Sequence, residues 1–328
     1  MIEWRGSIYT CDMRICSLLP SATEIVYALG LGDDLVGVSH ACDYPDAAAT
    51  KAVVSRSVRQ ITHLSSEEID AIVQQARANG NPLYWIDGDL LRELKPDLII
   101  TQELCEVCAI DSGSVFETAS KVLDYQPEIL TIRPNVVSDI LQNVRKIGAA
   151  TGFGQRGTEL ADSLQSRIKT VVEGVADVEN RPRVLCLDWL DPLRNTGQWV
   201  PELVEMAGGE ERLAVTGGLS RELTWGEIVD YAPEYLMVMP CAFGPERVRA
   251  ETAEKLTNLK GWNELPAVQM DRVFLFDGRI PTRHSPRVVD VLEGLAKAMH
   301  PQRFKGISSY EVLVKNRPEP RCPGSGFG

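Results

Sequence analysis

The sequence has no hydrophobic run long enough to cross a membrane. No stretch of the 328-residue chain approaches the roughly 18 apolar residues of a transmembrane helix. The first 20 residues contain neither the apolar segment of roughly 7–15 residues nor the small-residue cleavage site of a secretory signal. We therefore expect no membrane insertion and a cytoplasmic location for the chain as written. A chain trimmed of its leader would instead be periplasmic or extracytoplasmic.

Positive charge is also scarce. The chain carries 34 basic and 46 acidic side chains, which gives a formal net charge of −12. Proteins that bind nucleic acid or anionic membranes without a specific site need a basic surface. We therefore expect no nucleic-acid partner, although residues 279–287 form one local basic cluster.

The sequence lacks the cysteine density and the glycine motifs of several protein classes. Eight cysteines in a chain this long are too dilute for a disulfide scaffold, so thiols or metal ligands are the expected states. No G-x-G-x-x-G follows the first predicted strand, and neither G-x-x-x-x-G-K-[ST] nor G-x-S-x-G occurs. These absences argue against nucleotide-binding enzymes and α/β-hydrolases.

What the chain does contain is an alternation of strands and helices. Short apolar runs predict buried strands, and apolar residues recurring every three or four positions predict helices. The expected strands are 14–19, 35–38, 98–101, 129–132, 183–187, 235–238 and 272–276. The expected helices are 21–29 with Ser21 as its N-cap, 65–78, 90–94, 114–123, 135–150, 156–175, 200–207, 224–231, 246–256 and 285–299. This order predicts an α/β fold with parallel, doubly wound sheets.

The length of the chain suits two domains better than one. Residues 156–175 predict one continuous helix of about 30 Å, which could serve as a rigid spacer between two α/β blocks. The sequence therefore divides into five expected segments. These are an N-terminal tail (1–12), an α/β lobe (13–152), a connecting helix (153–178), a second α/β lobe (179–301) and a C-terminal tail (302–328).

Four candidate metal ligands follow two of the predicted strands. His40 and Cys42 come after the second strand, and Cys105 and Cys108 come after strand 98–101. If these strands are parallel neighbours, both turns lie at the sheet edge where open α/β sheets bind ligands. One imidazole and three thiolates suit Zn²⁺ or another thiophilic metal. A redox pair and structurally buried thiols are the alternatives.

Several short motifs, spread in order over most of the chain, carry a family resemblance. They are Ser-Leu-Leu-Pro-Ser-Ala-Thr-Glu-Ile (17–25), Gly-Val-Ser-x-x-x-Asp-Tyr-Pro (37–45), Leu-Lys-Pro-Asp-Leu-Ile (94–99), Asn-Thr-Gly (195–197) before Ala-Gly-Gly (207–209), and Ser-Pro-Arg (285–287). Together they resemble the helical-backbone, or class III, substrate-binding proteins of ABC transporters, and within them the cobalamin-binding branch in a form without a signal.

The resemblance implies a binding protein rather than an enzyme, with a specific architecture and ligand. It implies two Rossmann-like lobes joined by one long helix, with a corrinoid, such as cobalamin, in a cleft between them. The residues it places against the ligand are Pro20, Ser21, His40, Tyr44, Gln102, Glu103, Trp189, Trp199, Arg283 and His284. It also implies that exposed acids on the two lobes, here Glu117 and Glu227, contact the permease of an ABC transporter.

The residue types suggest how such a ligand would be held. His40 and His284 are candidate cobalt ligands, because a neutral imidazole commonly binds metals. Trp189 and Trp199 could offer flat apolar walls. Arg283 and Arg287 could grip an amide or phosphate group of the ligand, and a surface ion pair is the alternative for Arg287.

Two other functions stay open. The first is a cytosolic metal-binding or corrinoid-processing enzyme that uses the cluster of His40, Cys42, Cys105 and Cys108. The second is a siderophore or haem binder of the same fold. The sequence does not separate these ligands, because one fold supports many functions.

Overall fold

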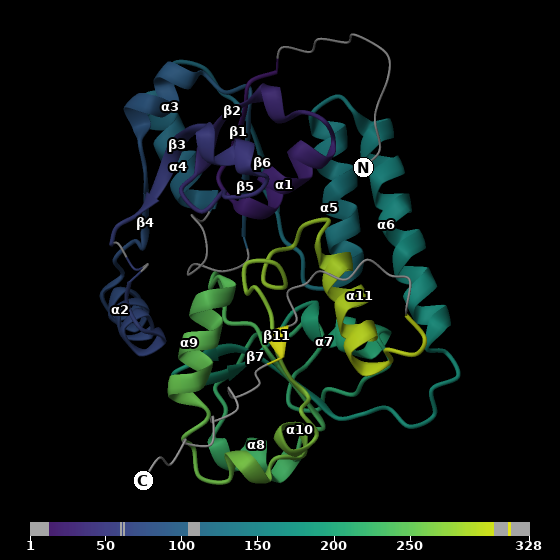
Figure 1. The fold of residues 1–328 in the computed structure, drawn as a ribbon. Coiled ribbons are helices and arrows are strands. Elements are labelled where there is room, and N and C mark those ends of the chain that lie inside the picture. Colours follow the sequence, from purple (N-terminus) through teal and green to yellow (C-terminus); the bar gives the residue numbers. More distant parts are fainter. Residues whose placement is uncertain (1–12, 60, 62, 104–111, 305–313, 316–328) are drawn as a thin grey trace, which may run out of the picture. The chain divides into compact units, whose positions relative to one another are not determined.

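The computed structural model describes residues 13–59, 61, 63–103, 112–304 and 314–315, and its chain divides into two compact units (Figure 1). Unit 1 comprises Met1–Thr170 and Arg283–Val289. Unit 2 comprises Val171–Thr282 and Asp290–Gly328. The expected boundaries placed residues 283–289 in the C-terminal lobe, whereas the structure groups them with unit 1. A short segment from late in the chain is thus part of the first unit.

Unit 1 is built on a six-stranded sheet in the order β4-β3-β2-β1-β5-β6. The strands are β1 (Ile15–Ser17), β2 (Leu35–Ser39), β3 (Ala52–Ser57), β4 (Tyr84–Ile86), β5 (Leu98–Gln102) and β6 (Glu128–Ile132). All neighbouring pairs are parallel except β3 and β4. The chain adds β2 and β3 on one side of β1, and later adds β5 and β6 on the other. β1 therefore marks the switch point at which open α/β sheets bind ligands.

Helices cover both faces of this sheet. The helices of unit 1 are α1 (Pro20–Ala28), α2 (Ser66–Asn79), α3 (Gly88–Leu94), α4 (Ser112–Val122), α5 (Val137–Ala150) and α6 (Gly154–Gly174), with short 3₁₀ turns η1 (Gly32–Asp34) and η2 (Asp46–Thr50). In Figure 1, α3 and α4 lie on one side of the sheet and α1 and α5 on the other. Leu91 and Val115 of α3 and α4 pack on Cys16 and Ile99 of the strands. Truncating such a fully buried leucine to alanine typically costs about 2–5 kcal/mol.

The start of α1 differs from the sequence-based expectation. Leu19 occupies the N-cap position without a side-chain cap, and Pro20 is the first helical residue. Proline is favoured there because its missing N–H would have no helical partner anyway. The expectation that Ser21 caps this helix was wrong, and its hydroxyl is left to make another contact. By contrast, Ser65 caps α2 as expected, in a capping box with Glu68.

The long helix expected at residues 156–175 is confirmed as α6, with 21 residues. It begins in unit 1 and its last residues belong to unit 2. Two glycines allow it to approach α5 closely. A Cβ added to Gly148 would lie only 2.7 Å from the Cα of Gly157, so a side chain there would force the helices apart.

Unit 2 contains a five-stranded sheet in the order β11-β10-β9-β7-β8. Its strands are β7 (Val184–Leu190), β8 (Leu193–Asn195), β9 (Tyr235–Val238), β10 (Val273–Leu275) and β11 (Val314–Lys315). Its helices are α7 (Val200–Met206), α8 (Trp225–Tyr231), α9 (Pro245–Lys255), α10 (Pro266–Gln269) and α11 (Val288–Met299), with the 3₁₀ turn η3 (Trp262–Glu264). The inner strands β7, β9 and β10 are parallel, and the edge strands β8 and β11 are antiparallel.

The α/β fold is confirmed, but the sheets are mixed rather than purely parallel. The antiparallel strands β4 and β8 span three residues each, which is too short to show an alternating pattern in the sequence. None of the described helices has the combination of length and apolar character that spanning a membrane requires.

Unit 2 also buries a carboxyl group. Glu211 is 7% exposed and accepts hydrogen bonds from the backbone N–H groups of Cys186, at 2.9 Å, and Leu213, at 3.2 Å. Burial is the main cause that raises the pKa of Glu211 to about 8. The folded protein therefore holds a proton on Glu211 at neutral pH, where an exposed glutamate would be ionised.

Replacing this group should change how stability depends on pH. The stability that protonated Glu211 contributes is complete below its unfolded pKa of 4.5 and is lost as the pH rises towards the folded value of about 8. Glu211→Gln keeps an accepting oxygen but does not titrate. Between about pH 5 and pH 8, the free energy of unfolding of the wild type should fall by roughly 3–4 kcal/mol relative to the variant, measured by urea unfolding.

A matched control is Glu205→Gln, because Glu205 is exposed on α7. This control should follow the wild-type pH dependence. The same dependence in wild type and Glu211→Gln would contradict the assignment of a protonated carboxyl to Glu211.

Candidate functional site

Six of the predicted site residues lie at one edge of the unit 1 sheet. β1 lies between β2 and β5, and its last residue, Ser17, pairs in register with Val38 and Ile100. The carboxyl ends of these three parallel strands are therefore side by side. The predicted residues that end or follow these strands are Pro20, Ser21, His40, Tyr44, Gln102 and Glu103.

A segment from late in the chain reaches the same edge. We call residues 283–287 the late segment; it belongs to unit 1. The Nε2 atom of His284 lies 3.1 Å from the Ser21 hydroxyl and 3.2 Å from the Gln102 side-chain oxygen. Because Ser21 does not cap α1, its hydroxyl is available for this contact. All three side chains are buried, so the structure joins three predicted ligand contacts into an internal hydrogen-bonded group.

Burial also fixes the charge of His284. The ring is 3% exposed, and burial lowers the pKa of His284 to about 4. The imidazole is therefore neutral at physiological pH, which is the form that can bind a metal. In this structure, however, its Nε2 faces Ser21 and Gln102.

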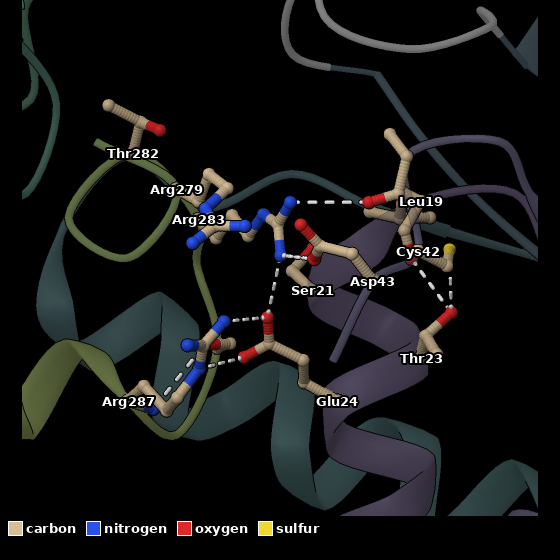
Figure 2. A network of polar contacts seen from close by, with 12 residues as sticks. Leu19, Ser21, Thr23, Glu24, Cys42, Asp43, Arg279, Thr282, Arg283 and Arg287 are labelled. Atoms are coloured by element: carbon tan, nitrogen blue, oxygen red, sulfur yellow. Dashed lines mark hydrogen bonds and ion pairs between the residues drawn. The ribbon is translucent and has the colours of Figure 1, made fainter. Parts of the chain in front are cut away.

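Both arginines of the late segment converge on one buried carboxylate of α1 (Figure 2). The side chain of Glu24 is 2% exposed. Arg287 donates from Nε to Glu24 Oε2 at 2.8 Å and from Nη2 to Oε1, while Arg283 donates from Nη1 to Oε1 at 3.2 Å. A buried carboxylate needs such paired donors, because removing a charge from water is otherwise costly.

The same arginines contact the turn that follows β2. We call residues 40–45 the β2 turn. Arg283 Nη1 lies 2.5 Å from Asp43 Oδ1, and its Nη2 donates to the Ala41 carbonyl at 3.2 Å. The Arg287 guanidinium lies 4.0 Å from the centre of the Tyr44 ring, within the range of a cation–π contact. Arg283 and Arg287 thus make contacts inside unit 1, and their expected role in gripping a ligand stays a prediction.

Two of the four predicted metal ligands, Cys42 and His40, lie within the described residues. The Cys42 thiol is buried, 3.0 Å from Thr23 Oγ1 and 3.2 Å from Ser39 Oγ. Burial raises the pKa of Cys42, which disfavours the thiolate that a metal requires. His40 Nδ1 lies 3.2 Å from the Ser55 carbonyl, and partial burial lowers the pKa of His40, so its ring is neutral.

The metal prediction is not tested by this structure, because Cys105 and Cys108 lie outside the described residues. Within the part of the chain that is described, no group of three or more His, Cys, Asp or Glu side chains could hold a metal ion.

The two predicted tryptophans occupy different environments in unit 2. Trp199 is 2% exposed, and its indole N–H donates to the Pro281 carbonyl at 2.9 Å, so the ring belongs to the core. Trp189 stands near the end of β7, half-buried, with its ring 5.2 Å from that of Phe243. Of the two, Trp189 keeps surface that a ligand could use.

The two acids predicted to meet a transporter also differ. Glu117 is exposed on α4 and pairs with Lys121 at 2.5 Å. Glu227 forms the capping box of α8 with Thr224 and pairs with Arg221 at 2.9 Å. These contacts lower the pKa of Glu227, first through the backbone N–H of Thr224. The carboxylate of Glu227 therefore has a local structural role.

Sequence reasoning missed Glu24 and Asp43. Both lie within recognised motifs, but only the arginine contacts make them functional candidates. Arg283 follows Glu24 by 259 positions and Asp43 by 240. No local pattern could connect residues so distant. The only available signal for Glu24 was an acid in the first turns of a predicted helix.

The neutral state of His284 gives a direct prediction. Histidine NMR should show the imidazole of His284 titrating near pH 4, well below its ordinary pKa of 6.5. Because this folded pKa is depressed, the stability contributed by neutral His284 is present above about pH 6.5 and is lost as the pH falls towards 4. The resonance is assigned by its loss in His284→Gln. A midpoint near 6.5 would contradict the buried environment.

Comparison with known proteins places this geometry in a family. Residues 15–280 match the family described as periplasmic binding protein. The chain is 24% identical over 298 residues to the uncharacterized ABC transporter substrate-binding lipoprotein YvrC of Bacillus subtilis (strain 168), covering 89% of this chain and 81% of that protein. It is 22% identical over 282 residues to a vitamin B12-binding protein of Vibrio parahaemolyticus serotype O3:K6, covering 85% and 86%.

Solved structures share the fold. The periplasmic heme-binding protein RhuT from Roseiflexus sp. RS-1 in apo form superposes with a TM-score of 0.67 at 21% identity, covering 89% of this chain and 99% of that one. The periplasmic vitamin B12-binding protein BtuF of Vibrio cholerae gives a TM-score of 0.62 at 21% identity, covering 87% and 96%. The expected family and two-lobed α/β class are thereby confirmed, and so is the expectation of a binding protein rather than an enzyme. The chain belongs to the periplasmic binding protein family.

Proposed function

We propose that this protein binds a corrinoid ligand and delivers it to an ABC transporter. The observation that carries this proposal is the set of curated relatives named vitamin B12-binding protein. They align with this chain at 21–24% identity, and the Vibrio parahaemolyticus protein covers 85% of it. The match extends over most of the chain, so it includes the strand ends at which ligands bind in open sheets.

The chemistry of several side chains supports a large ligand with amide groups and a metal. His40 is a neutral imidazole in the β2 turn, a form that can ligate cobalt. Tyr44 and Glu103 are exposed beside it at the same sheet edge and could bond to amides. Trp189 of unit 2 could pack against the apolar face of a flat ring system.

Haem is the second candidate. Two of the similar solved structures are named periplasmic heme-binding proteins, with TM-scores of 0.67 in both cases. A neutral His40 could ligate haem iron as readily as cobalt, because imidazole is a common ligand of both types of metal site. The two ligands therefore have to be separated by experiment.

The proposal includes a permease partner and an extracytoplasmic location. YvrC is named as an ABC transporter lipoprotein, and the solved structures are named periplasmic. We therefore favour an extracytoplasmic site of action over the cytoplasmic one expected from the start of the sequence. Glu117, exposed on α4, is the better candidate for a permease contact, because Glu227 already caps α8.

Ligand binding can be tested by visible spectroscopy of the desalted protein mixed separately with hydroxocobalamin and with hemin. We expect stoichiometric retention of hydroxocobalamin, with a spectral shift that His40→Ala abolishes. Loss of a metal–ligand contact should weaken affinity by roughly tenfold or more. Retention of hemin alone would favour the second candidate, and retention of neither would contradict both.

The contribution of Trp189 can be tested in the same assay. Trp189→Ala should weaken binding of hydroxocobalamin by roughly tenfold, the value of a buried aromatic contact. Trp225→Ala is the matched control in unit 2, because Trp225 starts α8, stacks on Trp262 at 6.4 Å and donates to the Lys260 carbonyl. Equal losses in the two variants would point to a general loss of stability and contradict a specific role for Trp189.

A further inference from the structure

We propose that Glu24, acting through Arg283 and Arg287, is a positioning residue that holds the β2 turn in the conformation used for ligand binding. The geometry that points to this is the convergence of two late-segment arginines on one buried carboxylate and, beyond it, on the turn (Figure 2). The ligand role of the turn rests on the function proposed above, whereas its positioning does not.

The charges of the four side chains in this network balance. Two guanidinium groups lie against Glu24, with side chains only 11% and 12% exposed for Arg283 and Arg287. Glu24 supplies one negative charge for these two positive charges. Asp43 supplies the second, at 2.5 Å from Arg283, so the four side chains sum to zero. Buried charges are tolerated when they are paired in this way, because uncompensated charge in the interior is strongly destabilising.

The charge that completes this balance belongs to Asp43, which lies in the β2 turn. Asp43 is 39% exposed and could point into water at little cost if the turn moved away. Movement would take the Asp43 carboxylate away from the Arg283 guanidinium, whose side chain is 11% exposed, and would take the Tyr44 ring away from Arg287. Displacement of the turn is therefore unfavourable. Glu24 fixes the position of the two arginines because it lies on a regular helix.

The late segment contacts three residues along the turn. Arg283 holds Ala41 through its carbonyl and Asp43 through its carboxylate, while Arg287 lies over the ring of Tyr44. Local backbone hydrogen bonds hold the two ends of the turn: the N–H groups of His40 and Cys42 donate to the carbonyls of Ser55 and Ser39, and the Pro45 carbonyl accepts from the N–H of Ala48. The late segment thus restrains the half of the turn that follows His40.

Hydrogen bonds between charged groups are stronger than those between neutral groups, so removing one should change the exchange rate of the turn by about tenfold or more. The variant of choice is Asp43→Ala, because Asp43 is on the surface and its removal leaves Glu24 bonded to both arginines. Glu24→Gln tests the centre of the network. Arg145→Gln is the matched control, since it removes an exposed ion pair with Asp162 of 2.7 Å between α5 and α6.

The experiment is hydrogen–deuterium exchange of the full chain, followed by mass spectrometry of peptides that cover the β2 turn and, separately, α5. In Asp43→Ala we expect about tenfold faster exchange in the turn and no change in α5. Arg145→Gln should leave the turn unchanged. Glu24→Gln should reproduce the turn effect, and if that variant does not fold, Asp43→Ala alone decides the question.

Two results would overturn the positioning role. One is wild-type exchange of the turn in Asp43→Ala. The other is an equal rise in the turn and in α5, which would show that the network only stabilises unit 1 as a whole.

The ligand role is measured separately, as the Kd of hydroxocobalamin and of hemin for the same variants. Asp43→Ala should raise the Kd of the ligand that the wild type binds by about tenfold. Faster exchange with unchanged affinity would overturn the link to binding. If the wild type binds neither compound, the proposed function fails, while the exchange data still decide the positioning role.

Discussion

The buried carboxylate of Glu24 is the constraint on which the organisation of unit 1 depends. A charge with 2% of its side chain exposed requires compensating donors, and those donors come from Arg283 and Arg287, some 260 residues later in the chain. The requirement explains why residues 283–289 group with unit 1 although the chain on either side of them groups with unit 2. The unit is therefore discontinuous in sequence, and its completion depends on an ion pair rather than on apolar packing alone.

At other titratable groups, burial favours the neutral form and not an ion pair. His284, Cys42 and Glu211 lie in the interior without a compensating charge of the kind that Glu24 has, and burial moves the pKa of each towards the neutral form. The edge of the unit 1 sheet thus combines one charged network with a neutral histidine and a neutral thiol. The Nε2 atom of His284 contacts Ser21 and Gln102, and the Cys42 thiol contacts Thr23 and Ser39.

The switch point at β1 determines where these groups meet. Because β2 and β5 flank β1 in parallel, the residues after all three strands emerge at one sheet edge. The late segment adds its own residues to that edge, so side chains from four distant parts of the sequence come together. The likeness to vitamin B12- and heme-binding proteins fits a site built from such strand ends, while the choice among large ligands depends on individual side chains such as His40 and Trp189.

Much of the fold could be predicted from local pattern. The expected helices and strands are present, including α6. These features follow from periodicity and from capping residues such as Ser65, which act within a few positions of the chain. The short edge strands β4 and β8 lacked such a signal, because three residues show no period.

The sequence by itself therefore determined most of the helices and inner strands, their order and the family, since each depends on neighbouring residues or on recognisable motifs. Only the tertiary structure decided that Trp199 is core, that Ser21 faces His284 rather than capping α1, and that Arg283 and Arg287 serve Glu24 and the β2 turn. Those assignments depend on burial and on contacts between residues as far as 263 positions apart. The energy of a charge or hydrogen bond is set by the surroundings that folding creates, and no local pattern in the chain encodes them.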